Sequence, residues 1–183
     1  MNPGGSLSFS PTDDTYVYGG STSNNYGSAT YLRARNDVQE YRSYLKFNVS
    51  GLSGSVTRAR LRLYAYDGSD SGGVISRTAD TYLNSTTAWT ESGLTFSKAP
   101  AVGAALATSG AVANNTWVEF DVTTAVTGNG TYSFALTTPS GNSVYYYSSE
   151  ASSNRPELIV ETGTAVVPTA TTAPTTAPTQ APA

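Results

Sequence analysis

The sequence contains no cysteine and no histidine. Without cysteine there can be no disulfide and no thiolate nucleophile, and without histidine the chain lacks the commonest imidazole base and transition-metal ligand. Charged residues make up only 13% of the chain, against about a quarter in an average protein. Glycine, serine, threonine, asparagine and tyrosine take their place, which is typical of extracellular β-proteins. The absence of cysteine and histidine excludes most catalytic chemistry.

Two kinds of enzyme remain compatible with these absences. Glycoside hydrolysis needs only two carboxylates at the right separation, but nothing in the sequence pairs the available ones. The available carboxylates include Glu91, Glu119, Asp121 and Glu150. A polysaccharide lyase would use a tyrosine base with a neutralising group, and the chain has both tyrosine and arginine. Because no catalytic constellation is recognisable, we predict that the protein is not an enzyme.

Long apolar runs are also missing. No stretch approaches the about 18 consecutive apolar residues that a membrane helix needs, and the net charge of the chain is −3. We expect neither a membrane nor nucleic acid as a partner.

The length and the composition of the C-terminal end predict one domain and a tail. The chain has 183 residues, and domains most often hold about 100 to 150. Residues 168–183 are four Pro, six Thr, five Ala and one Gln, a composition with nothing to bury. We predict a flexible N-terminal segment (1–8), a β-sandwich domain (9–162) and a linker (163–183). Such a linker implies an adjacent domain or an anchor, and hence a secreted or cell-surface protein.

Short runs of alternating apolar and polar residues predict an all-β domain. In one run Leu45, Phe47 and Val49 are expected to face inward, and Tyr44 and Lys46 outward. Other strands are expected near residues 16–18, 30–35, 59–66, 74–78, 118–122, 132–137, 143–149 and 158–161. About nine strands of this kind predict a two-sheet β-sandwich of jelly-roll type. The alanine-rich stretch 99–113 is interrupted by proline and glycine and is predicted to be a long loop.

Seven of the ten basic residues fall between positions 33 and 62, together with only two acids. Guanidinium groups suit bidentate contacts with carboxylates or sulfates, and interleaved tyrosines could pack on sugar rings. This combination predicts an anionic polysaccharide as the partner. The candidate binding residues are Tyr31, Arg33, Arg35, Tyr44, Lys46, Arg60, Arg62, Tyr64 and Tyr66. In the alternative interpretation the charges maintain solubility and block edge pairing, while the tyrosines fill cross-strand pairs.

An ordered series of segments resembles the DNRLRE domain, an extracellular jelly-roll module of bacteria and archaea that includes a carbohydrate-binding family found beside alginate-degrading catalytic domains. The segments are FSPTDDTYV (9–17), NYG (25–27), RSYLKF (42–47), ARLRLY (59–64), WTE (89–91), LTF (94–96), AP (99–100), FDVT (120–123), SSEA (148–151) and RPEL (155–158). The resemblance implies a noncatalytic polysaccharide-binding module, with anionic glycans such as alginate preferred. The alternative is a structural unit of a cell-surface adhesin or extracellular filament without a sugar ligand.

Arg42 and Glu150 lie in segments that carry this resemblance, and small or apolar residues surround each of them. We predict that they form a structural pair at the edge of the sandwich. Removing one partner of a buried pair costs about 3 to 5 kcal/mol.

Oxygen-rich loops offer ligands for calcium, which binds carboxylate, carbonyl and amide oxygens. Asp13 and Asp14 form one candidate metal cluster, and Asp67 with Asp70 forms another. The second lacks the acidic spacing and flanking helices of an EF-hand, so a hairpin loop is expected there. The prediction is that no cofactor is required and that a structural calcium ion is the metal to test.

Overall fold

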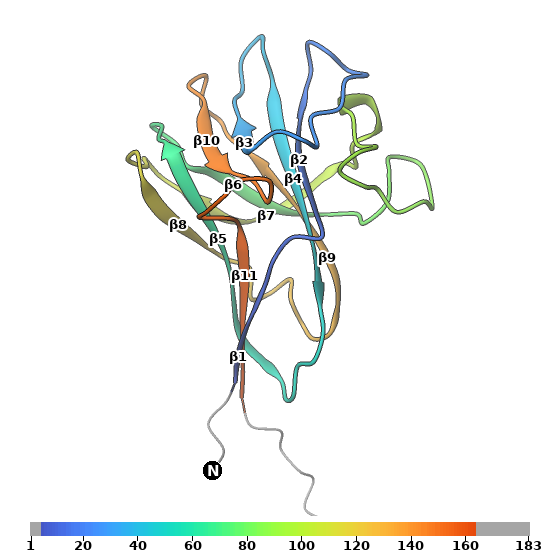
Figure 1. The fold of residues 1–183 in the computed structure, drawn as a ribbon, viewed down its shortest axis with the longest axis vertical. Helices are drawn as coiled ribbons and strands as arrows, with labels where there is room; N and C mark the ends of the chain where they lie inside the picture. Colours follow the sequence, from blue (N-terminus) through green and yellow to red (C-terminus); the bar gives the residue numbers. More distant parts are fainter. Residues whose placement is uncertain (1–4, 164–183) are drawn as a thin grey trace, which may run out of the picture.

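The structure is a computed structural model that describes residues 5–163. Eleven strands form two antiparallel sheets that pack face to face (Figure 1). The strands are β1 (Ser6–Phe9), β2 (Asp13–Tyr18), β3 (Tyr31–Ala34), β4 (Tyr41–Val49), β5 (Val56–Asp67), β6 (Gly73–Thr78), β7 (Val102–Ser109), β8 (Thr116–Asp121), β9 (Gly130–Thr137), β10 (Val144–Tyr147) and β11 (Glu157–Thr162), with one 3-10 helix, η1 (Phe96–Lys98). In this part of the chain no helix has the length and apolar character to cross a membrane.

The topology confirms the predicted two-sheet β-sandwich. The six-stranded sheet has the order β1-β11-β5-β10-β3, with β8 paired to β5, and the five-stranded sheet has the order β2-β4-β9-β6-β7. From β2 to β6 successive strands alternate between the two sheets, as expected of a jelly roll. Strands that carry neighbouring basic residues in the sequence therefore lie in opposite layers.

The core lies between the two sheets and follows the predicted alternation. Leu45, Phe47 and Val49 of β4 are buried against Leu61 and Leu63 of β5. Each such side chain contributes about 1.5 to 3 kcal/mol by leaving water. The connection between these strands turns through two glycines with positive φ, at positions 51 and 54, a conformation that glycine adopts without steric cost.

The outer face of the five-stranded sheet is covered, so the prediction that Tyr44 and Lys46 face solvent is wrong. Residues 79–101 fold over this face and place Trp89 against β4, where Tyr44 and Lys46 are buried. The Lys46 ammonium lies 4.1 Å from the centroid of the Trp89 ring and 3.7 Å from the Asp13 carboxylate, and it donates to the Trp89 carbonyl. Alternation predicts a two-sided strand, but it does not predict what covers each side.

Two segments predicted to lack regular structure form edge strands. Ser6–Phe9, most of which was assigned to the flexible N-terminal segment, pairs with β11 as β1. Within the stretch predicted as a long loop, Val102–Ser109 forms β7 beside β6. Both strands lie at sheet edges and are mostly exposed. The sequence of β7 carries no apolar alternation, and that of β1 alternates over only four residues. The predicted linker, apart from residue 163, lies outside the described residues.

Replacing Trp89 with alanine should lower the free energy of unfolding by about 3 to 5 kcal/mol, the usual cost of emptying a buried aromatic site. Trp89 is fully buried and packs edge-on against Tyr44. Urea unfolding followed by circular dichroism measures the loss. Trp117→Ala is the control, because Trp117 is half-exposed and its loss should be clearly smaller. Equal losses would contradict the idea that Trp89 holds the 79–101 segment on the sheet.

Candidate functional site

The outer face of the six-stranded sheet carries most of the partly exposed aromatic side chains on the strands. Because Ala59, Leu61, Leu63 and Ala65 of β5 point into the core, the residues between them point outward. Outward residues of paired strands lie opposite one another. Trp117 of β8 lies opposite Tyr64 of β5, and on β10 Tyr147 and Tyr145 lie opposite Tyr31 and Arg33 of β3. We name this surface the tyrosine face: Tyr31, Arg33, Tyr64, Tyr66, Trp117, Tyr145 and Tyr147.

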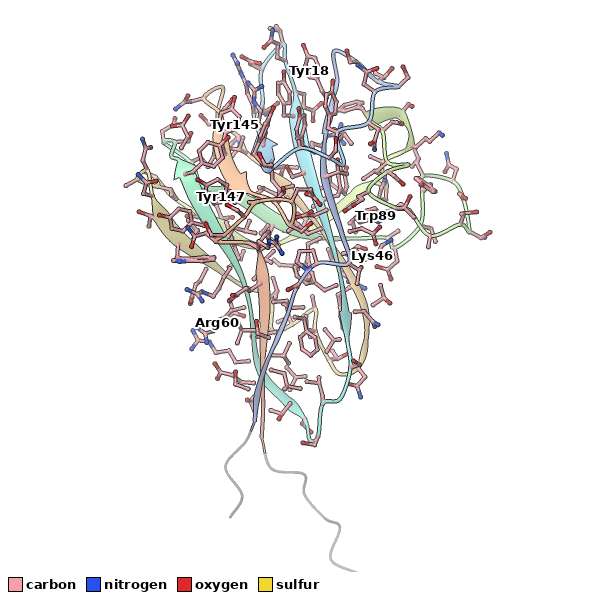
Figure 2. The ribbon with its side chains drawn as sticks, in the orientation of Figure 1. Tyr18, Lys46, Arg60, Trp89, Tyr145 and Tyr147 are labelled. Atoms are coloured by element: carbon pink, nitrogen blue, oxygen red, sulfur yellow. The ribbon has the colours of Figure 1, made fainter. Side chains whose placement is uncertain are left out.

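The rings of the tyrosine face form one connected array. Ring centroids lie 5.3 Å apart for Trp117 and Tyr64, 5.8 Å for Tyr64 and Tyr147, and 4.9 Å for Tyr147 and Tyr66. The array continues across β10, with 5.8 Å from Tyr66 to Tyr145 and 5.6 Å from Tyr145 to Tyr31. Figure 2 shows Tyr145, Tyr147 and Arg60 on one side of the sandwich, and Trp89 with Lys46 on the other.

Arg33 is the cation of the tyrosine face. Its guanidinium carbon lies 3.6 Å from the centroid of the Tyr41 ring and 5.0 Å from that of Tyr145, and its Nε donates to the Ser143 hydroxyl at 3.0 Å. Across residues 5–163, Arg33 forms no ion pair with a carboxylate. The stacked guanidinium therefore keeps its charge available to an anion from solution.

Arg60 and Arg62 lie on the same sheet face, but three glutamates neutralise them. Arg60 contacts Glu119 at 2.9 Å and Glu161 at 2.8 Å, while Arg62 contacts Glu119 at 3.1 Å and Glu157 at 3.3 Å. The two arginines and three glutamates together carry a net charge of −1. An anionic ligand would have to displace a carboxylate to reach either guanidinium.

The remaining predicted cations are also paired. Arg35 pairs with Asp37. The predicted Arg42–Glu150 pair is wrong, because Arg42 contacts Glu40 at 2.7 Å and lies 4.5 Å from the centroid of the Phe96 ring. In extended chain, residues two apart project to the same side, so Arg42 finds its partner locally. The basic stretch is gathered in the sequence but largely neutralised in space.

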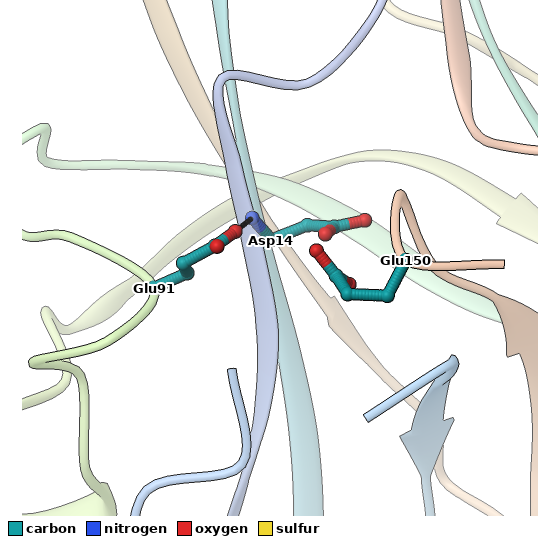
Figure 3. Close-up of side chains that lie close together, drawn as sticks. All are labelled: Asp14, Glu91 and Glu150. Atoms are coloured by element: carbon teal, nitrogen blue, oxygen red, sulfur yellow. Dashed lines mark hydrogen bonds between the residues drawn. The ribbon is translucent and has the colours of Figure 1, made fainter. Parts of the chain in front are cut away.

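Three carboxylates gather at the β2 edge of the sandwich, as Figure 3 shows. Asp14, Glu91 and Glu150 each offer an oxygen within 4.8 Å of the others. Asp14 is fully buried and accepts hydrogen bonds from the backbone N–H of Ser149 at 2.9 Å and from the Ser149 hydroxyl at 2.6 Å. Burial raises the pKa of Asp14 to about 7, and the charge of Glu150 adds to the shift. Burial also raises the pKa of Glu91.

This carboxylate group differs from both predicted metal clusters. Asp13 and Asp14 do not form one cluster, because Asp13 points to Lys46 at 3.7 Å while Asp14 joins Glu91 and Glu150. The carboxylate of Asp70 is occupied by the hydroxyls of Ser69 and Ser140, while Asp67 lies across from Tyr145 in the sheet.

Sequence reasoning missed the gathering of Asp14 with Glu91 and Glu150, because the three residues come from distant segments. One oxygen of Glu150, Oε2, is buried without a hydrogen-bond partner. A shared proton or a divalent cation would satisfy such a group, and the structural calcium ion stays a prediction.

Comparison with known protein families gives one result for this chain. The sequence model of carbohydrate-binding module family 96 matches residues 6–162, the range from β1 to β11. No curated protein matches the chain.

The carboxylate group predicts how stability depends on pH. The folded state keeps the Asp14 proton up to a pKa of about 7, whereas the unfolded chain releases it near 3.8. The folded state therefore binds more protons between these values, and the Asp14 contribution to the free energy of unfolding falls as the pH rises through this window and is constant above it. Over this range the loss reaches about 1.4 kcal/mol per pH unit.

Asp14→Asn imitates the protonated side chain. Its stability relative to the wild type, measured by urea unfolding, should rise between pH 4 and pH 8 by a few kcal/mol. Asp70→Asn is the control, since Asp70 lies outside the carboxylate group. A constant difference between Asp14→Asn and wild type would contradict the raised pKa.

The structural calcium prediction is tested in the same assay. Millimolar calcium should raise the free energy of unfolding of the wild type at pH 8, because a divalent cation favours the ionised carboxylates. The gain should disappear in Asp14→Asn. Magnesium, which tolerates fewer geometries, serves as the comparison ion. Equal stability with and without calcium would rule out the predicted ion.

Proposed function

This chain belongs to carbohydrate-binding module family 96, and from that membership we propose that it holds a polysaccharide on the tyrosine face. The observation that carries the proposal is the connected array of partly exposed rings around Arg33. No other outward sheet face joins aromatic rings to an unpaired cation within the described residues. The module acts by binding and is noncatalytic.

The dimensions of the tyrosine face favour a polymer over a single sugar. The row from Trp117 through Tyr64 and Tyr147 to Tyr31 crosses the strands β8, β5, β10 and β3. Adjacent strands lie about 4.8 Å apart, so the row extends about 14 Å. A short stretch of glycan can lie along it, with the chain continuing beyond both ends.

The ligand that fits this charge distribution is an anionic glycan such as alginate. Among residues 5–163, the Arg33 guanidinium has no carboxylate partner. A guanidinium is suited to the bidentate recognition of a uronate carboxylate. Fewer cations are available to such a ligand than the basic stretch of the sequence indicated, because Arg60 and Arg62 are neutralised by glutamates. One cationic subsite on a mostly uncharged face favours a ligand with spaced charges.

The same proposal places the module outside the cell, next to a further domain or an anchor. Its support is the family, whose modules are typically extracellular, and the Thr/Pro-rich composition of residues 168–183. The module would then keep its parent protein at a polysaccharide surface.

The second candidate function is a structural unit of an adhesin or filament without a sugar ligand. The feature that favours it is β7, an exposed edge strand of eight residues without a charged side chain. Unprotected edges of this kind can pair with another chain. Self-association that grows with protein concentration, measured by light scattering, would favour this function, whereas a monomer at every concentration would exclude it.

Affinity electrophoresis tests the first function. Gels that contain alginate should retard the protein relative to polymer-free gels, and added salt should weaken the retardation because it screens the charge contact. Arg33→Gln should weaken alginate binding about tenfold or more, since a hydrogen bond to a charged group contributes about 1.5 to 3 kcal/mol.

Two comparisons make the electrophoresis decisive. Lys98→Gln removes the same charge from η1, away from the tyrosine face, and should bind as the wild type does. Pectin and a neutral glucan, run in parallel gels, report the preference for acidic chains. Unchanged mobility of the wild type in every gel would refute the proposed function.

A further inference from the structure

Four of the six rings of the tyrosine face are packed through a face against another tyrosine ring. The Tyr147 ring is parallel to that of Tyr64 within 7° and to that of Tyr66 within 25°. Tyr31 is stacked on Tyr16 at 5.3 Å and 16°. Parallel rings at such separations are offset-stacked, so each of these four rings already uses at least one face within the protein.

The ring face of the tryptophan on this surface is also occupied. The Arg62 guanidinium lies 4.4 Å from the centroid of the Trp117 ring, and the ring of Tyr64 meets it edge-on at 78°. Trp117 is also the only tryptophan on this surface, since Trp89 is buried beside the other sheet. The residue type best suited to stacking on sugars therefore offers little open face.

Whereas most rings of the tyrosine face have an occupied face, most of its hydroxyl groups are unoccupied. Buried tyrosines use theirs inside the protein: the hydroxyl of Tyr44 donates to the carbonyl of Pro100, that of Tyr132 to Gly128 and that of Tyr146 to Gly72. Among residues 5–163, the hydroxyls of Tyr64, Tyr66, Tyr145 and Tyr147 form no hydrogen bond, and none of them is a buried unsatisfied atom. They are accessible to solvent and free to donate and accept.

The Tyr66 hydroxyl remains a protonated donor at neutral pH. Burial and the neighbouring Tyr145 raise the pKa of Tyr66 to about 12. A phenol is both a donor and an acceptor, which matches the hydroxyl and carboxylate groups along the edge of an acidic sugar chain. Arg33, opposite Tyr145 in the sheet, adds a charged donor at one end of the row.

We propose that the tyrosine face recognises its glycan through the phenolic hydroxyls of Tyr64, Tyr66, Tyr145 and Tyr147, and not by stacking sugar rings on aromatic faces. The inference rests on the proposed function and specifies its chemistry. The ligand presents its polar edge to the sheet, so specificity depends on the placement of hydroxyls and carboxylates along the chain. An apolar sugar face contributes little.

Tyrosine-to-phenylalanine variants separate the two modes of recognition, because they remove the hydroxyl and keep the ring. We expect Tyr145→Phe and Tyr147→Phe each to raise the Kd for sodium alginate about tenfold, as loss of a hydrogen bond to a charged acceptor predicts, and the double variant to bind more weakly still. Isothermal titration calorimetry or affinity electrophoresis measures the change. Tyr82→Phe is the matched control, since the Tyr82 hydroxyl contacts Thr90 in the segment over the opposite sheet and should not affect binding.

The outcomes distinguish this inference from the function on which it rests. Wild-type affinity in the phenylalanine variants, together with lost binding in Tyr147→Ala, would overturn hydroxyl recognition and establish stacking while the proposed function stands. A wild-type protein that binds no polymer would overturn the proposed function itself. Urea unfolding of Tyr145→Phe and Tyr147→Phe should match the wild type, because the substitution preserves ring packing and removes no hydrogen bond within the protein. A matching curve assigns any lost affinity to the hydroxyl.

Discussion

The pairing of β5 with three other strands is the constraint on which both the core and the tyrosine face depend. This strand pairs with β8 along one edge and with β11 and then β10 along the other. Because side chains alternate, one register sends Leu61 and Leu63 into the core and Tyr64 and Tyr66 to the surface. A slip of one residue would reverse both sets, so the apolar core fixes the position of the outward rings.

The same pairing explains why the positive charge of the sequence is not a positive surface. Outward residues of β8 and β11 meet those of β5 across the sheet, and these residues are Glu119, Glu157 and Glu161. Arg60 and Arg62 are therefore surrounded by carboxylates that lie far away in the sequence. Arg33 lies on β3, at the sheet edge, where its neighbours on β10 are tyrosines. Position in the sheet, more than local composition, decides which cation is available to a ligand.

Features that depend on neighbouring residues in the sequence could be predicted, whereas features that depend on contacts between distant segments could not. Alternation is a local property, so the sandwich and the inward faces of β4 and β5 were predicted correctly. The covering of Tyr44 and Lys46 by residues 79–101 depends on packing between distant segments, and so does the gathering of Asp14 with Glu91 and Glu150. β7 was missed because an exposed edge strand needs no apolar alternation. Within the tyrosine face, the outward side of β5 was predictable, whereas its contacts with Trp117 and Tyr147 required the strand order.

Mutual stacking of the rings has a consequence for affinity as well as for the mode of recognition. A flexible side chain loses conformational entropy when it is fixed by a ligand, at a cost of about 0.5 to 1.5 kcal/mol. Tyrosine has only two side-chain dihedrals, and on this face each ring is held by neighbours within 4.9 to 5.8 Å. The contacts that withdraw the ring faces from a sugar therefore also hold the hydroxyls in place before it arrives. A rigid row of donors and acceptors on a sheet can bind a polymer at little entropic cost, and its selectivity comes from the spacing that the strands impose.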